Sequence, residues 1–185
     1  MKKLTILGTA LLFIAQVGCA GARGEGENAT TPVTRIGTYD SRAIAVAFVG
    51  SEVYKVTAGK KLADMMAEYK KAKAAGDKKR VEELKALAEA QQALLHKQGF
   101  STAPVDDILD HINNQLPAIK KQANVGLLVS KWDKRTLAKH MSAERVDVTM
   151  NLVEAFKPND KQRKSAIEIQ KHAPVPLEKM KGHKH

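Results

Sequence analysis

The chain of 185 residues has a single cysteine and few aromatic residues. Because Cys19 lies within the first twenty residues, we expect no disulfide in the rest of the chain. Aromatic residues make up only 4% of the sequence, which leaves Val, Ile, Leu, Ala and Met to form the core. The sequence also lacks three common catalytic motifs: a Gly-rich phosphate loop, a Gly-x-Ser-x-Gly turn and a cysteine nucleophile beyond Cys19. We therefore predict a protein that is not an enzyme and needs no cofactor.

Basic residues are in excess, with 31 Lys and Arg against 20 Asp and Glu. This excess implies an acidic partner, a membrane surface or nucleic acid. Lys2 and Lys3 precede a short apolar run over 4–17, and small residues follow it up to Ala20. That order is typical of a secretory signal, and the run is too short to span a membrane. We predict a signal over residues 1–20 and a secreted protein that does not bind nucleic acid.

Cys19 allows a second interpretation of the same segment. A lipoprotein signal also ends in small residues, followed by a cysteine that becomes lipidated. Gly18 suits this pattern, whereas Gln16 stands where an aliphatic residue is expected. Both outcomes stay open: cleavage after Ala20, or an anchored chain that begins at a lipidated Cys19.

Residues 57–98 contain no proline and are rich in Lys, Glu, Ala and Leu. Gly76 can end one helix in the left-handed conformation and Asp77 can cap the next. We predict two amphipathic helices that form a hairpin about 30 Å long, with Gly99 as the C-cap of the second helix. Its apolar residues recur at helical spacing on both sides of Gly76: Leu62, Met65, Met66, Tyr69 and Ala72, then Leu84, Leu87, Ala88, Leu94 and Leu95.

The remaining segments predict short strands and helices around this hairpin. After a flexible leader (21–32), we expect a strand at 33–39 and a helix at 41–49 capped by Asp40 or Ser41, with a continued strand as the alternative. Pro104 suits the first turn of a helix over 104–123, and Pro117 should break that helix near Gln115. The later elements are strands at 125–129, 135–141 and 146–148, helices at 149–156 and 160–171, and a disordered tail beyond Ala173.

The hairpin tip carries the clearest candidate site. Six basic residues flank the turn, and Asp77 is the only acid between them: Lys70, Lys71, Lys73, Lys78, Lys79 and Arg80. Such a tip could attract acidic segments or anionic head groups within a Debye length of ~10 Å, although exposed helices carry lysines in any case. Met65 and Met66 offer adaptable apolar contact surface, with core packing as the alternative.

Other titratable residues favour structural roles. Acids in a first helical turn are favourable to the helix dipole, which accounts for Asp106, Asp107 and Asp110 without catalysis. The scattered His96, His111 and His140 suit solvated helix positions. His172, His183 and His185 could bind a transition metal only loosely, because a flexible tail has no fixed geometry. We predict no catalytic residue and no metal site.

Three segments resemble the Skp/OmpH family of periplasmic chaperones: Arg35-Ile36-Gly37-Thr38-Tyr39-Asp40-Ser41-Arg42-Ala43-Ile44, Val125-Gly126-Leu127-Leu128-Val129 and Val146-Asp147-Val148-Thr149-Met150-Asn151-Leu152-Val153. The resemblance covers about 33–157 and leaves 158–185 as a basic C-terminal extension. It implies a β core interrupted by a helical hairpin, and trimers whose arms surround unfolded outer-membrane proteins. The breaks at Gly76, Gly99 and Pro117 depart from the family arm and imply a shorter cage.

Together these observations predict an α+β fold: a small antiparallel β core, completed by oligomerisation and interrupted by a protruding α-helical hairpin. Short strands with little apolar material need partners for their edges, and another copy of the chain is the natural one. The predicted function is that of a periplasmic, ATP-independent holdase for unfolded envelope proteins. The alternative is a lipid-anchored structural or tethering protein that binds anionic surfaces.

Overall fold

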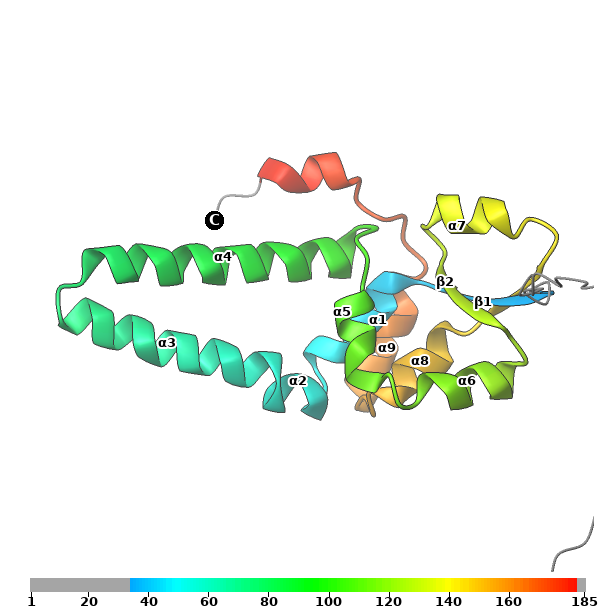
Figure 1. The fold of residues 1–185 in the computed structure, drawn as a ribbon, viewed down its shortest axis with the longest axis horizontal. Helices are drawn as coiled ribbons and strands as arrows, with labels where there is room; N and C mark the ends of the chain where they lie inside the picture. The colour runs from blue at the N-terminus through cyan, green and yellow to red at the C-terminus, as the bar shows by residue number, and fades with distance from the viewer. Residues whose placement is uncertain (1–33, 183–185) are drawn as a thin grey trace, which may run out of the picture. The chain divides into compact units, whose positions relative to one another are not determined.

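Helices dominate a mixed α and β fold in the computed structural model, which describes residues 34–182 (Figure 1). The predicted signal, Cys19, the leader, His183 and His185 lie outside the described residues. In chain order the elements are β1 (Arg35–Tyr39), α1 (Ser41–Val49), α2 (Glu52–Val56), α3 (Ala58–Ala74), α4 (Lys78–Phe100), α5 (Asp106–Leu109), the 3-10 helix η1 (Asp110–Ile112), α6 (Leu116–Ala123), β2 (Leu127–Ser130), α7 (Lys134–Lys139), β3 (Glu144–Asp147), α8 (Thr149–Ala155), α9 (Asp160–Ile169) and the 3-10 helix η2 (Leu177–Gly182).

The three strands form a parallel sheet in the order β2-β1-β3. Ile36 of the central strand lies opposite Leu127 on one side and Arg145 on the other. The prediction of an antiparallel core is therefore wrong. Parallel neighbours need long crossover connections, and the chain supplies them as helices: α1 to α6 between β1 and β2, and α7 between β2 and β3.

The prediction of a strand at 135–141 is also wrong, because this segment forms the helix α7. The Asp133 carboxylate accepts a hydrogen bond from the backbone N–H of Thr136 at 3.0 Å and so caps the helix. Leu137 then points to the sheet, where it packs with Ile36 and Val129. The third strand begins at Glu144, slightly earlier than expected.

Apolar side chains cover both faces of the sheet. A small cluster beneath α7 holds Ile36, Val129, Leu137 and Ala143. The larger core lies on the other face, under α1, α5, α8 and α9, and contains Tyr39, Ile44, Phe48, Ile108, Ile112, Leu152, Val153 and Phe156 among others. At Gly37 an added Cβ would lie within about 3 Å of Leu128, Val148 and Val125, so the central strand leaves no room for a side chain here.

The hairpin predicted at 57–98 is formed by α3 and α4 (Figure 1). Gly76 has φ of +72°, and the Asp77 carboxylate accepts a hydrogen bond from the backbone N–H of Arg80 at 3.0 Å. Both turn roles are therefore confirmed. Gly99 does not end the second helix, because α4 continues to Phe100 and extended Ser101 stops it. A glycine inside a helix costs only about 0.5–1 kcal/mol, which this length of helix tolerates.

The segment after the hairpin is more broken than expected. Pro104 precedes α5 instead of starting it, and α5 has only four residues. The predicted break near Gln115 is confirmed, since α6 starts at Leu116 with Pro117 in its first turn. A proline there lacks only an N–H that would have no helical partner.

The chain beyond Ala173, expected to be disordered, is bonded to the end of α4 at Val175 and then forms η2. The backbone N–H of Val175 donates to the carbonyl of Phe100 at 2.9 Å, and the hydroxyl of Ser101 donates to the carbonyl of Val175. The guanidinium of Arg42 also donates to the carbonyl of His172 at 2.8 Å. These bonds fix the tail beside the end of α4.

Candidate binding site on the helical hairpin

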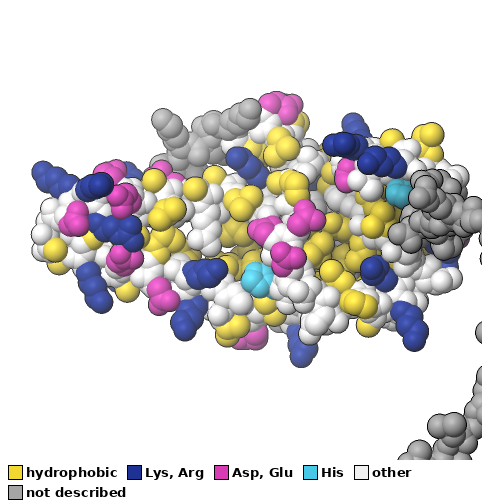
Figure 2. Space-filling model, in the orientation of Figure 1, with side chains coloured by type: hydrophobic (Ala, Val, Ile, Leu, Met, Phe, Trp, Pro, Cys, Tyr) yellow, Lys and Arg dark blue, Asp and Glu magenta, His cyan; other side chains and the backbone are white. Residues whose placement is uncertain are grey.

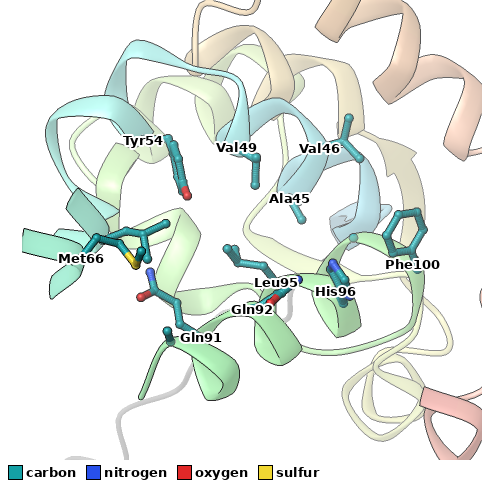
Figure 3. Close-up of a pocket in the computed structure, with 13 residues that line it drawn as sticks. Ala45, Val46, Val49, Tyr54, Met66, Gln91, Gln92, Leu95, His96 and Phe100 are labelled. Atoms are coloured by element: carbon teal, nitrogen blue, oxygen red, sulfur yellow. The ribbon is translucent and has the colours of Figure 1, made fainter. Parts of the chain in front are cut away.

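A cavity of about 580 Å³ opens between α1 and the base of the hairpin (Figure 3). We call it the groove. Figure 3 shows Val49 of α1, Tyr54 of α2 and Leu95 of α4 directed toward the same space. Its full lining is Ala45, Val46, Val49, Tyr54, Leu62, Met66, Ala88, Gln91, Gln92, Leu95, His96, Gly99 and Phe100.

The groove exists because α1 has two apolar sides. Ile44, Ala47 and Phe48 face the core and are buried, whereas Val46 and Val49 lie on the side turned to the hairpin. Val49 is 44% exposed, and Phe100, which also lines the groove, is 50% exposed. Large apolar side chains thus remain accessible to solvent around a concave surface, which is the usual character of a binding site.

A smaller cavity of about 290 Å³ continues along the hairpin between α3 and α4. It shares Met66, Ala88 and Gln92 with the groove, so the two hollows adjoin. Tyr69 and Leu84 complete its apolar wall, and Lys85 and Glu89 lie at its edge. An apolar channel with few charged groups therefore runs from α1 part of the way toward the hairpin tip.

The two predicted contact methionines lie on this channel. Met66 lines both cavities and is 44% exposed, which places it outside the core. Met65 is half-buried and lines only the smaller cavity. The flexible thioether of Met66 can adapt to partners of different shape.

The basic tip is smaller than predicted, because Arg80 is paired. Its guanidinium lies 2.7 Å from the Glu68 carboxylate across the hairpin and 2.9 Å from that of Glu83 along α4. Hydrogen bonds to Glu83 and Glu68 also raise the pKa of Arg80 above its usual value. The turn at Gly76 places Glu68 of α3 beside Arg80 of α4. Residue spacing along a single helix cannot predict such an ion pair between two helices.

Five exposed lysines remain at the tip without an ion pair to another described residue: Lys70, Lys71, Lys73, Lys78 and Lys79. Figure 2 shows basic side chains at the far end of the hairpin, with acidic side chains among them. From here on, these five lysines are the basic tip.

A second polar cluster, which the sequence analysis missed, lies where the parallel strands end. Arg42 and Asp40 form an ion pair at 2.7 Å, with side chains only 1% and 3% exposed. The Arg42 guanidinium stacks over Trp132 at 5.2 Å, and the Thr149 hydroxyl accepts a hydrogen bond from the Asp40 N–H. The sequence held a signal for this cluster, since Asp-Ser-Arg directly follows the first strand.

This cluster lies at the edge where α/β sheets commonly bind ligands. However, Arg42 donates to both oxygens of Asp40 and also holds the carbonyl of His172. Both oxygens of the Asp40 carboxylate are therefore already occupied by groups of the protein. We interpret the pair as a structural link between the end of β1 and the C-terminal tail.

The other candidate residues are dispersed. Asp107 accepts a hydrogen bond from Gln98 at 2.7 Å, and His111 stacks on Phe48 at 5.0 Å. His172 lies 3.5 Å from Glu168, and His140 follows the end of α7. Asp106 and Asp110 lie in the first turns of α5 and η1. Within residues 34–182, no three His, Cys, Asp or Glu side chains are placed to hold a metal ion.

No family model, curated protein or solved structure matches this chain. The resemblance to the Skp/OmpH family therefore stays a prediction from the sequence. Among the described helices, none is long and apolar enough to cross a membrane.

Proposed function

We propose that this protein is an ATP-independent periplasmic holdase that binds unfolded envelope proteins, including outer-membrane proteins, along its hairpin. The observation that carries the proposal is the groove, an open apolar cavity of about 580 Å³ that adjoins a second hollow on the same arm. The secretory signal and the Skp/OmpH resemblance predicted from the sequence support the location and the class of client.

The energetics suit transient binding of many sequences. Burying one large apolar side chain contributes about 1.5–3 kcal/mol, so two or three such side chains offset the cost of ordering a short segment. The walls are mainly apolar, with aliphatic side chains, Met66, Tyr54 and Phe100, and only two glutamines and His96 add polar groups, so they impose little directional specificity. A holdase needs this combination, because it must release its client without ATP.

The basic tip adds long-range attraction. Five lysines act over a Debye length of ~10 Å at 0.1 M salt, so they raise the encounter rate with acidic segments more than the final affinity. We therefore expect the groove to set the dissociation rate of a client and the tip to set its association rate.

The groove is tested by comparing two methionines with the same substitution. Met66→Glu places a carboxylate in both cavities, whereas Met141→Glu changes a methionine of the body that is 80% exposed. We expect Met66→Glu to weaken binding of a fluorescent, permanently unfolded polypeptide at least tenfold, and Met141→Glu to leave it unchanged. Equal affinities for both variants would contradict the use of the groove.

The tip is tested by reversing its charge. In one variant the five lysines of the tip become Glu; in the control, five exposed lysines of the body become Glu: Lys121, Lys134, Lys139, Lys161 and Lys164. Both variants have the same net charge. We expect the tip variant alone to slow association with an acidic unfolded client about tenfold at low salt. The same slowing in both variants would mean that net charge acts without regard to position.

The tethering alternative uses the same tip with a different partner. It requires a lipidated Cys19, which mass spectrometry of the mature chain detects, and binding to vesicles that contain anionic lipid. A mature chain that starts at Gly21 and does not bind such vesicles would exclude tethering. A lipidated chain that binds the vesicles but no unfolded client would replace the holdase proposal.

A further inference from the structure

A second apolar face runs along α4, on the side opposite the groove. Its residues recur three or four positions apart, which places them on one side of the helix, and all of them are exposed: Ala86, Leu87, Ala90, Ala93 and Leu94. Leu87 is 56% and Leu94 44% exposed. The residues that pack toward α3 and the groove lie about half a turn away: Leu84, Ala88 and Leu95. We call the exposed set the outer face of α4.

The described part of the chain leaves most of the outer face uncovered. In Figure 1, α3 runs along one side of α4, and η2 lies on the other side only near the end of α4. The hydrogen bonds between the tail and α4 involve Phe100 and Ser101, beyond the outer face. Leu87 and Leu94 keep their exposure with the tail in place.

We propose that the outer face binds a second copy of this chain, with the two α4 helices antiparallel and the two-fold axis at Ala90. Residues at equal distances on either side of the axis then lie at the same height. Leu87 of one protomer lies beside Leu94 of its partner on one flank of the contact, and Ala86 lies beside Ala93 on the other. The leucines bury apolar surface, while the small alanines let the two helices approach closely.

Charge selects the antiparallel orientation. Glu83 and Lys97 lie on the same side of α4 as the outer face, one beyond each end. In the antiparallel pair each Glu83 meets Lys97 of the partner, which gives two complementary contacts. A parallel pair would place Glu83 against Glu83 and Lys97 against Lys97, and would bring the two basic tips together.

Glu83 can make this contact without losing its present one. Its Oε2 atom lies 2.9 Å from Arg80, and the side chain is 45% exposed. A carboxylate accepts several hydrogen bonds, so Oε1 can serve Lys97 of the partner. The groove lies on the other side of α4, so each protomer of the dimer can still bind a client there.

A face of five residues, flanked by Glu83 and Lys97, forms a small interface, which favours a weak, reversible dimer. The first test is the mass of the chain in solution, measured by light scattering up to several hundred micromolar. We expect the mass to rise with concentration toward that of two chains. Ala90→Glu puts two carboxylates at the axis and should raise the dissociation constant at least tenfold. The control Ala67→Glu, at an exposed alanine of α3, should not change it.

The second test reverses the proposed charges. Glu83→Lys alone and Lys97→Glu alone should each weaken the dimer, because each leaves like charges opposed in two places. The double variant restores both contacts and should recover the dissociation constant of the original chain to within about twofold. Circular dichroism of each variant checks that α4 is intact.

A monomer at every concentration, a trimer, or a double variant as weak as the single ones would overturn the dimer. Met66→Glu, which tests the groove, should leave the mass unchanged. The dimer and the holdase proposal can therefore fail separately.

Discussion

Two arginines show how differently the body and the hairpin use charge. Arg42 in the body is 1% exposed, pairs with Asp40, stacks over Trp132 and holds the tail at His172. Arg80 on the hairpin pairs with two glutamates, yet its side chain is 39% exposed. A buried charge must keep its partner, because an unpaired one has lost its hydration. An exposed pair can exchange its partner for water.

The difference teaches where the fold is rigid and where it is adaptable. In the body, directional bonds connect the end of β1, the start of α1 and the tail, so each constrains the others. On the hairpin, the ion pairs are screened by solvent and the apolar channel is open on one side. A rigid body that carries an adaptable arm is the arrangement that the proposed holdase requires.

The largest expected effect is the difference in stability between variants of these two arginines. Arg42→Met leaves the Asp40 carboxylate buried without its partner and should lower the free energy of unfolding by about 3–5 kcal/mol. Arg80→Met leaves solvated glutamates and should not shift the midpoint of chemical denaturation measurably. Denaturant titration followed by circular dichroism measures both. Similar midpoints for the two variants would show that the buried pair does not stabilise the body.

A smaller effect is expected at alkaline pH. Burial, with smaller contributions from Asp106 and Asp133, raises the pKa of Tyr39 to about 12 from its ordinary value of 10. Above pH 10 the unfolded chain loses this proton while the folded chain keeps it, so stability falls as pH rises from 10 to 12. The loss approaches roughly 2–3 kcal/mol.

Tyr39→Phe removes this titration and provides the control for the many lysines that titrate in the same range. The pH dependence of denaturation should therefore be shallower in Tyr39→Phe than in the original chain between pH 10 and 12. Parallel curves for the two proteins would show that Tyr39 titrates normally.

The smallest effects are expected when one glycine from each region is replaced by alanine. Gly37→Ala forces Leu128 and Val148 to move in the packed sheet and should cost about 1–3 kcal/mol of global stability. At Gly76 an added Cβ meets nothing within 4 Å, but its φ of +72° strains alanine by about 1 kcal/mol. Gly76→Ala should therefore speed hydrogen exchange only near the tip, whereas Gly37→Ala should speed it throughout the body. Exchange that rises equally everywhere in both variants would contradict the division into two regions.

The hairpin could be predicted because its signals are local. Helical spacing, the left-handed turn at Gly76 and the cap at Asp77 depend on residues close together in the chain, and the structure has all three. The break at Pro117 is local in the same sense. The strand expected at 135–141 failed because the cap at Asp133 and the burial of Leu137 outweigh the weak strand propensity there.

The candidate site was predicted only in part. The lysines of the tip and Met66 were candidates from the sequence, and the structure leaves them exposed, while their role in binding stays a prediction. The pairing of Arg80 with Glu68 was missed, because it joins two helices across a turn. The groove was missed for the same reason, as its walls come from α1, α2, α3 and α4.

The sequence by itself determined a lysine-rich hairpin with a glycine turn, because caps, turns and helical spacing depend on neighbours within about four residues. Only the tertiary structure decided that the strands run parallel, that Arg42 is buried against Asp40, and that α1 lies beside the hairpin to form the groove. Strand direction and burial depend on segments up to about a hundred residues apart, which no local pattern records.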